Sequence, residues 1–326
     1  MRDDDKYIYA VSRIRAKELN LLNKQFLEQL IDAKSYDECL RMLSDKGWDI
    51  PQSKEVLLDD IIKKEQDKIW NLIYELLEDI HVFDVFLYEN DFHNLKAAIK
   101  ENYSKKEYDG NLYIEKGTVD LNIIKSAVEK RDFSSLPDYM VEVADKAYET
   151  FFHTGDGQLL DMIVDKSMLE TIIKKAKETD NELLVTYAEM KVATANLNVA
   201  IRGNLAGKTE SFFEESLAHQ DTLDVNSLKR AALQSIQSIL DYLSSTKYSE
   251  AIDDIKESLT AFERWCDNKM IELIKPQLYN PFTLSPIAAY VIARESEIKS
   301  VRLILSGQIN DFDKNEVRER LRETYV

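Results

Sequence analysis

Lys54–Ile80 reads KEVLLDDIIKKEQDKIWNLIYELLEDI, and its apolar residues recur mostly at steps of three and four positions. Asp, Glu, Lys and Gln fill most of the remaining positions. This spacing places the apolar side chains along one face of a helix that is longer than the average of about 11 residues. The segment therefore predicts an amphipathic α-helix with one face in a core.

The composition extends this helical prediction to the whole chain of 326 residues. Glycine and proline together make up about 4% of it, whereas roughly 12% is usual. A turn-rich β-sandwich needs more of both residues, and a doubly wound nucleotide-binding fold needs glycines at its phosphate turns. Hydrophobic residues are 44% and charged residues 32%, so the chain can bury a core and is not of a disordered type. We predict an all-α fold.

Two helices near the C-terminus have sequence signals at their ends. Ser285 is followed by a proline, which is typical of an N-cap and a first helical residue, and Gly307 follows about twenty residues later as a stop. Asp313 and Glu316 have the spacing of a capping pair that opens a final helix. The apolar stripe of that final helix is predicted to consist of Val317, Leu321 and Tyr325.

Two apolar and polar patterns recur about every hundred residues. The first occurs at steps of 100, and its positions are Leu40, Leu43, Trp48; Met140, Val143, Tyr148; and Leu240, Leu243, Tyr248. The second occurs at steps of 102 and 104, and its clearest residues are Asp91, Asn94, Leu95; Asn196, Leu197; and Glu297, Ser300, Val301. Chance similarity between leucine-rich helices is the alternative explanation. A period this long exceeds the ~20–50 residues of short solenoid repeats and suits copies of a small domain.

The repeat predicts three similar helical domains over residues 1–105, 106–208 and 209–326. Three such domains in series can close around a pseudo-threefold axis, which gives a funnel with a central cavity.

The charge of the chain limits its partners. With 43 Lys and Arg against 60 Asp and Glu, the net charge is −17, which disfavours binding to nucleic acid and to an anionic lipid surface except through a local contact. The longest apolar run, Pro286–Ala293, is too short to span a membrane, which takes about 20 residues. Two cysteines without close spacing suit a reducing cytosol.

Positive charge is concentrated locally in spite of the acidic total. The positively charged residues concerned are either ordinary charges on helix surfaces or part of a docking surface for acidic or carbonyl-rich parts of a partner. The candidate interface residues are Arg13, Arg15, Arg202, Arg302, Arg318 and Arg322.

The sequence offers no clear catalytic, cofactor or metal motif. Gly203–Thr209, GNLAGKT, resembles a phosphate-binding loop but has three residues where that loop has four before its Gly-Lys pair, and a helix is predicted before it. It is predicted to be a helix C-terminus, and a nucleotide-binding enzyme is kept as an alternative. The four histidines form no metal-binding pattern and are predicted to be structural or surface residues: His81, His93, His153 and His219. We expect no catalytic residues, no cofactor and no metal.

Several segments resemble one family throughout the chain. The opening YIYAVSRIR of residues 7–15, DFHNLK of 91–96 and the C-terminal segments ARESEI, RLIL and VRERLRETYV are similar to the C subunit of the archaeal and bacterial A/V-type rotary ATPases, which is homologous to the d subunit of the eukaryotic vacuolar enzyme. Two positions depart from the family pattern, with Ser300 in place of asparagine and Ala193 in place of an acidic residue.

The resemblance implies a funnel of three helical domains and a non-catalytic role. The implied partners are the central shaft subunits of D and F type and the membrane proteolipid rotor ring, on whose cytoplasmic face the protein sits. The implied function is a peripheral coupling that transmits torque for ATP-linked proton or sodium transport. A helical scaffold or adaptor that binds peptides or other subunits in a groove is the alternative from the residues alone.

Overall fold

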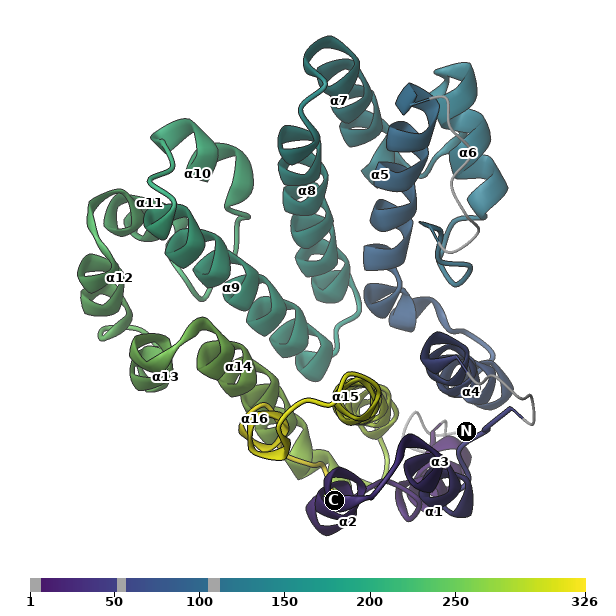
Figure 1. Ribbon diagram of the computed structural model, residues 1–326. Coiled ribbons are helices and arrows are strands. Elements are labelled where there is room, and N and C mark those ends of the chain that lie inside the picture. The colour runs from purple at the N-terminus through teal and green to yellow at the C-terminus, as the bar shows by residue number, and fades with distance from the viewer. Residues whose placement is uncertain (1–6, 52–56, 105–111) are drawn as a thin grey trace. The chain divides into compact units, whose positions relative to one another are not determined.

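Helices make up all the regular structure of the residues described by a computed structural model, which are 7–51, 57–104 and 112–326 (Figure 1). No strand occurs in these ranges. The predicted all-α fold class is confirmed. The chain forms two compact units: unit 1 comprises Met1–Ile80 and Ala251–Val326, and unit 2 comprises His81–Glu250. The division into domains 1–105, 106–208 and 209–326 stays a prediction.

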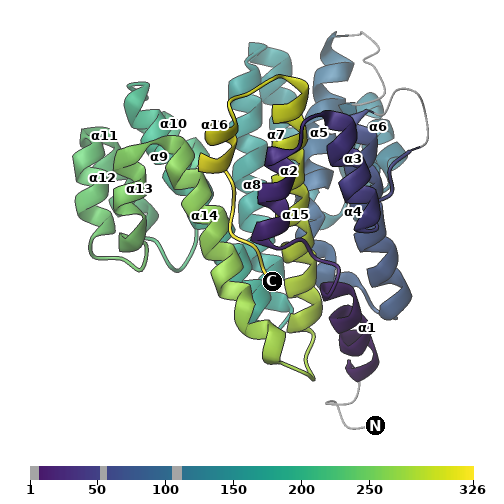
Figure 2. The same ribbon diagram turned by 60° about the horizontal axis from the view of Figure 1, so that its bottom comes forward.

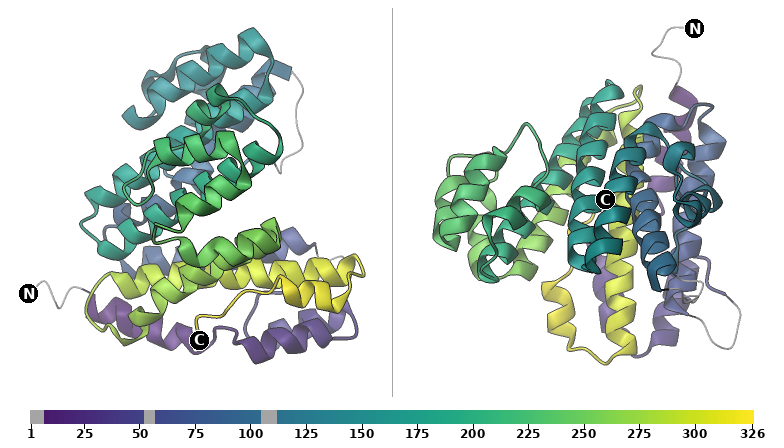
Figure 3. Two further views of the ribbon diagram at one scale, coloured as in Figure 1. Left: turned by 90° about the vertical axis from the view of Figure 1, so that its left-hand side faces the viewer. Right: turned by 90° about the horizontal axis from the view of Figure 1, so that it is seen from above.

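Unit 1 combines the two ends of the chain around the long helix α15. This helix packs against α1, α2, α3 and α4 from the N-terminal end and against α14 and α16 from the C-terminal end. Figures 2 and 3 show the N-terminal helices, in purple, beside the yellow C-terminal ones. The helices of unit 1 are α1 Ile8–Glu18, α2 Lys24–Asp32, α3 Tyr36–Asp45, α4 Leu58–Leu76, α13 Ile252–Glu257, α14 Leu259–Ile274, the 3-10 helix η6 Lys275–Tyr279, α15 Ser285–Ile309 and α16 Lys314–Glu319.

The helix predicted over Lys54–Ile80 is α4, and it is shorter than expected. It begins at Leu58 and ends at Leu76, because the backbones of Leu57 and Leu77 are extended. Residues 54–56 of the prediction lie outside the described residues. The apolar face is confirmed, since five of its predicted members are buried: Ile61, Ile62, Ile69, Leu72 and Ile73.

The C-terminal helix signals are partly confirmed. Asp313 caps α16 by accepting from the backbone N–H groups of Asn315 (2.8 Å) and Glu316 (3.4 Å). Ser285 is the first residue of α15 and not its N-cap, because Leu284 occupies that position without a side-chain bond. The helix also continues two residues past Gly307, where a Cβ atom would lie 2.9 Å from Cγ2 of Val317. That glycine allows a close approach and does not stop the helix.

The stripe predicted for the final helix is only partly helical. α16 ends at Glu319, so Val317 is its one helical member. Leu321 and Tyr325 lie beyond the helix and are nevertheless buried. The chain past α16 therefore packs its apolar side chains in an irregular conformation.

Unit 2 is built around two further long helices, α5 and α9. α5 packs against α6, α7 and α8, and α9 packs against α8, α10, α11 and α12 (Figure 1). The elements of unit 2 are the 3-10 helices η2 His81–Phe86 and η4 Phe133–Ser135 and the α-helices α5 Tyr88–Ser104, α6 Leu121–Lys130, α7 Asp138–Thr154, α8 Gly157–Glu178, α9 Glu182–Leu205, α10 Glu210–Ser216, α11 Val225–Gln234 and α12 Ile236–Leu243. The 3-10 helix η5, Ser249–Ala251, follows α12.

The two sequence patterns fall on corresponding helices. The first pattern begins on α3, α7 and α12, and all nine of its residues are buried. The second pattern lies on α5, α9 and α15, and its residues are buried too.

Candidate functional site

Buried polar side chains on the three long helices hold the backbone of the segment that precedes a shorter helix. On α5, the amide of Asn94 accepts from the backbone N–H of Ile114 (2.9 Å) and donates to its carbonyl oxygen (2.8 Å). One turn earlier, Asp91 accepts from the N–H groups of Thr118 (2.9 Å) and Val119 (3.1 Å). We call this set of contacts the first polar junction. The last residue held by this junction, Val119, directly precedes Asp120, which is the N-cap of α6.

Asp91 is completely buried within the first polar junction. The hydroxyl of Thr118 donates to it at 2.6 Å and also lies 2.9 Å from the hydroxyl of Tyr139. Burial raises the pKa of Asp91 to about 6, although these hydrogen bonds favour its charged form. Gly117 leaves room for this carboxylate, because a Cβ atom there would clash with Oδ1 of Asp91.

The second polar junction repeats these contacts on α9. Asn196 accepts from the N–H of Ala218 (2.9 Å) and donates to its carbonyl oxygen (2.8 Å), as Asn94 does with Ile114. Ala193 occupies the position that corresponds to Asp91 and has no carboxylate. The buried Glu189, one helical turn earlier on α9, accepts instead from the N–H (3.3 Å) and the hydroxyl (3.1 Å) of Thr222. The hydroxyl of Thr222 lies 2.6 Å from that of Tyr248.

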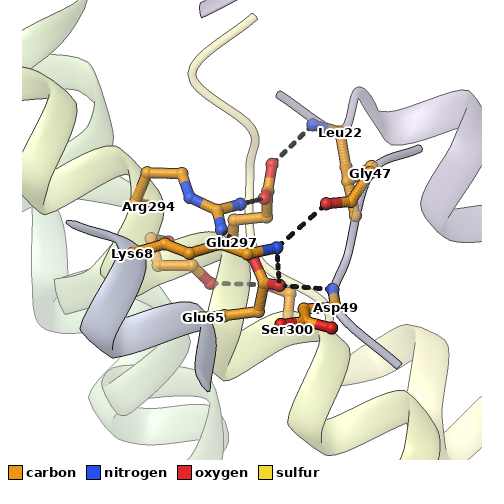
Figure 4. Close-up of polar contacts among 9 residues, drawn as sticks. Leu22, Gly47, Asp49, Glu65, Lys68, Arg294, Glu297 and Ser300 are labelled. Carbon is orange, nitrogen blue, oxygen red and sulfur yellow. Dashed lines mark hydrogen bonds and ion pairs between the residues drawn. The ribbon is translucent and has the colours of Figure 1, made fainter. Parts of the chain in front are cut away.

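The third polar junction lies on α15 and joins it to the N-terminal end of the chain. Glu297, at the position of Asp91, accepts from the backbone N–H of Leu22 at 2.5 Å (Figure 4). Leu22 directly precedes Asn23, the N-cap of α2, as Val119 precedes the N-cap of α6. Ser300, at the position of the two asparagines, donates to the carbonyl oxygen of Ser296 in its own helix (3.1 Å).

Three further charged side chains belong to the third polar junction: Arg294, Glu65 and Lys68. Arg294 donates to Oε2 of Glu65 on α4 at 2.6 Å and is hydrogen bonded to Glu297. The other oxygen of Glu65 accepts from Lys68 (2.6 Å) and from the N–H of Asp49 (2.8 Å), as Figure 4 shows.

The charged groups of this junction are deeply buried. The exposed fractions are 8% for Arg294, 1% for Glu65 and 8% for Glu297. Burial, opposed by Arg294 and the N–H of Leu22, raises the pKa of Glu297. Burial acts to lower the pKa of Arg294, but Glu297 and Glu65 outweigh it and raise that pKa. The charges are therefore held by one another and not by solvent.

The second sequence pattern contains some of the residues that form these junctions and lacks others. Asp91, Asn94, Asn196, Glu297 and Ser300 belonged to the second pattern. Glu189, Glu65 and Arg294 were not singled out as partners. Glu189 precedes Ala193 by four residues, which places both on one helix face, and this spacing is the signal that could have found it.

Five of the six candidate interface arginines contact other parts of unit 1. Arg15 donates to the carbonyl oxygens of Gln277 (2.5 Å) and Asn280 (2.8 Å). The other four pair with carboxylates: Arg13 with Glu75, Arg302 with Asp59, Arg318 with Glu28 and Asp32, and Arg322 with Asp267. Arg202 lies exposed on α9 in unit 2. The structure does not bring the six together at one site, and their role at an interface stays a prediction.

The glycine-rich segment GNLAGKT is a helix C-terminus, as predicted. α9 continues to Leu205, and Gly207 follows the helix with a φ angle of +63°. Gly203 lies inside the helix, where a Cβ atom would be 2.5 Å from the ring of the buried Phe213. The side chain of Lys208 donates to Gln158 (3.0 Å).

The remaining motif predictions concern metals and membranes. His81 bonds Asp84 (3.1 Å), His93 bonds the carbonyl oxygen of Leu112 (3.1 Å), and His153 lies 3.3 Å from Glu149. Within the described ranges, no group of three or more His, Cys, Asp or Glu side chains could hold a metal ion. Among the helices of those ranges, none combines the length and the apolar character needed to cross a bilayer.

Unit 2 also contains a groove of about 750 Å³. Ion pairs lie on its rim, between Lys96 and Asp165 (2.6 Å) and between Lys191 and Glu89 (2.5 Å). Its apolar lining includes Met162, Met168, Leu169, Val199 and Phe212.

These features define an all-α protein in which long helices hold successive segments through repeated polar junctions. The chain belongs to the ATP synthase (C/AC39) subunit family, whose model matches residues 10–320. This confirms the resemblance to the C subunit of the A/V-type rotary ATPases.

Relatives from bacteria and archaea cover almost the whole chain. It is 22% identical to the C subunit of the V-type sodium ATPase of Enterococcus hirae, over 96% of this chain and 97% of that protein. It is 26% identical to the C subunit of the A-type ATP synthase of Methanocaldococcus jannaschii, over 97% of this chain and 86% of that protein. It is 23% identical to the C subunit of the V-type ATP synthase of Thermus thermophilus, over 97% and 98% of the two chains. The family supports a role as a subunit of a rotary ATPase.

Proposed function

We propose that the chain is a non-catalytic central-stalk subunit that couples the rotating shaft to the membrane rotor ring. Its partners would be shaft subunits of D and F type and the proteolipid ring, and its place would be peripheral, on the cytoplasmic side of the membrane. In this role it transmits torque for ATP-linked proton or sodium transport. The observation that carries the proposal is the match to the ATP synthase (C/AC39) subunit family over residues 10–320.

The packing of the chain supports a mechanical role. A torque-transmitting part has to resist deformation, and close-packed interiors transmit strain because their compressibility is low. The buried amides of Asn94 and Asn196 fix backbone segments to long helices by two hydrogen bonds each. The predicted funnel of three domains would distribute such a load over three similar parts.

Reconstitution tests the coupling function directly. Ring-containing membranes, shaft subunits and the catalytic subunits are combined with and without this chain, and ion flux is measured together with ATP hydrolysis. We expect flux driven by ATP only when the chain is present. Flux of equal size without it would refute the coupling role.

Charge reversal tests the predicted interface separately. Arg202→Glu, at an exposed position, should weaken retention of the chain on the shaft and ring in a salt-dependent way. The control is Arg230→Glu on the exposed side of α11, with thermal unfolding of both variants measured first. Equal retention of both variants would remove Arg202 from the interface.

The groove of unit 2 favours the scaffold alternative as a second candidate. Its apolar lining and charged rim suit an amphipathic helix of another protein. Purification of the chain from its own cells distinguishes the two, because the coupling function predicts a stoichiometric complex with shaft subunits and a proteolipid ring. An adaptor would be recovered with other proteins and without the ring.

A further inference from the structure

The third polar junction differs from the first two in how the chain connects its parts. Asn94 and Ile114 are 20 residues apart, and Asn196 and Ala218 are 22 residues apart. Leu22 and Glu297 are 275 residues apart, and the chain between them leaves unit 1 and passes through unit 2. Short connections therefore keep the partners of the first two junctions near each other, and no short connection does so at the third.

Ion pairs cross the third junction at its edges, around the apolar side chains that α15 and the N-terminal helices bury. Lys24 pairs with Glu323 (3.4 Å), Arg318 on α16 with Glu28 (2.9 Å) and Arg302 with Asp59. All of these pairs join residues 7–51 and 57–76 to the C-terminal segment. The pairs of Lys24 and Arg302 are largely solvent-exposed, and that of Arg318 is partly exposed. Exposed ion pairs contribute little to stability.

The centre of the third junction holds several buried charges, and the centres of the others hold fewer. Arg294, Glu65 and Glu297 are all nearly inaccessible, whereas the first junction buries the single carboxylate of Asp91. Separating α15 from the N-terminal helices would return three charged groups to water, which recovers the cost of removing them from it. Opening is therefore less unfavourable here than at a purely apolar contact of the same size.

We propose that the third polar junction is a seam, at which α1–α4 separate reversibly from α14–α16 while the first and second junctions stay closed. The seam is a property of the folded chain by itself and does not depend on the proposed coupling function. At this seam, unit 1 opens between its N-terminal helices and its C-terminal helices.

Distance measurements between spin labels test the seam. One label pair, Ser44→Cys on α3 and Asn310→Cys after α15, spans the third junction at exposed positions. The control pair, Ala206→Cys after α9 and Asn226→Cys on α11, spans the second junction, also at exposed positions. Both pairs are made in the full chain with Cys39 and Cys266, which are buried, replaced by alanine. We expect two distances for the seam pair and one for the control pair.

Joining the ends of the chain provides the decisive comparison. A head-to-tail cyclised chain with a flexible linker should lose at least half of the longer-distance population, because the linker limits separation, and a linear chain carrying the same linker should keep it. Arg294→Met should enlarge that population, because it leaves Glu297 without its cation and Glu65 with Lys68 alone, and it should leave the control pair unchanged. A single distance for the seam pair in both the linear chain and Arg294→Met overturns the proposal. If Arg294→Met does not fold, the linear chain is measured in urea below its unfolding midpoint, with the same criterion.

Discussion

Asn94 and Asn196 lie 102 residues apart in the sequence and make the same two hydrogen bonds. Each accepts from a backbone N–H at 2.9 Å and donates to the carbonyl oxygen of that same residue at 2.8 Å. Both amides are buried, so neither can exchange its protein partner for water. The two copies of the sequence pattern therefore share their hydrogen bonds as well as their spacing.

Removal of either amide should destabilise the chain. Asn196→Ala leaves the N–H and the carbonyl oxygen of the buried Ala218 without a partner, which costs about 1–3 kcal/mol. Asn94→Ala removes the same two hydrogen bonds from Ile114, and its cost should lie toward the lower end of that range because Ile114 is 37% exposed. Urea unfolding of the full chain measures the loss. Ser300→Ala is the matched control from the same sequence pattern, and it should cost less because that hydroxyl donates to a carbonyl oxygen of its own helix and does not hold a separate segment. Equal losses for all three variants would contradict the equivalence of the two asparagines.

Asp91 should make stability depend on pH. Its pKa is about 6 in the folded chain against a usual 3.8, so its contribution is largest below pH 4 and is lost as the pH rises through 6. Asp91→Asn removes this dependence, and the unfolding free energy of the wild type relative to the variant should fall by roughly 2–3 kcal/mol between pH 4 and pH 7.5. Urea unfolding across that range gives the difference. The control Asp145→Asn, on the exposed side of α7, gives the effect of the same substitution at a surface position.

Arg294 should be among the most sensitive charged positions. Arg294→Met leaves the buried Glu297 without its cation and leaves the buried Glu65 with Lys68 alone, a type of change that costs about 3–5 kcal/mol. The comparison is Lys146→Met, which opens a partly exposed pair with Glu215 (3.1 Å) and should cost at most about 1 kcal/mol. Chemical denaturation of both variants measures the two losses. Similar small values would show that the buried pairs add little to the fold.

Two glycines should respond to alanine in opposite directions. Gly203→Ala places a Cβ atom against the ring of the buried Phe213, and such overpacking costs about 1–3 kcal/mol. Gly157 is the first residue of α8 and has open space around it, so Gly157→Ala should stabilise the helix by up to about 1 kcal/mol. Thermal unfolding of the pair measures both signs. A neutral Gly203→Ala would mean that Phe213 moves aside freely.

The candidate site was accessible from sequence only where its residues obey the repeat. Asp91, Asn94 and Asn196 share a register, so their spacing singled them out before any contact was known. Ala193 broke the pattern, and only the structure shows that Glu189 replaces the missing carboxylate from one turn earlier. The pairing of Arg294 with Glu65 joins residues 229 apart, and no local pattern reports such a contact.

The candidate interface arginines also show that sequence does not reveal which distant residues face each other. Their clustering in an acidic chain suggested a surface for a partner, because sequence shows where charge lies and not what faces it. The structure places Arg318 beside Glu28 and Arg302 beside Asp59, contacts between the two chain ends that sequence distance concealed.

The amino-acid sequence by itself determined the helical class, the family and the register of the repeated polar residues, because periodicity, composition and spacing are local properties of a chain. The tertiary structure alone decided which segments those residues hold, that both chain ends share one unit, and that Glu297 meets Leu22. Such contacts depend on how distant helices pack, and a buried carboxylate is stable only where packing brings it a donor or a cation.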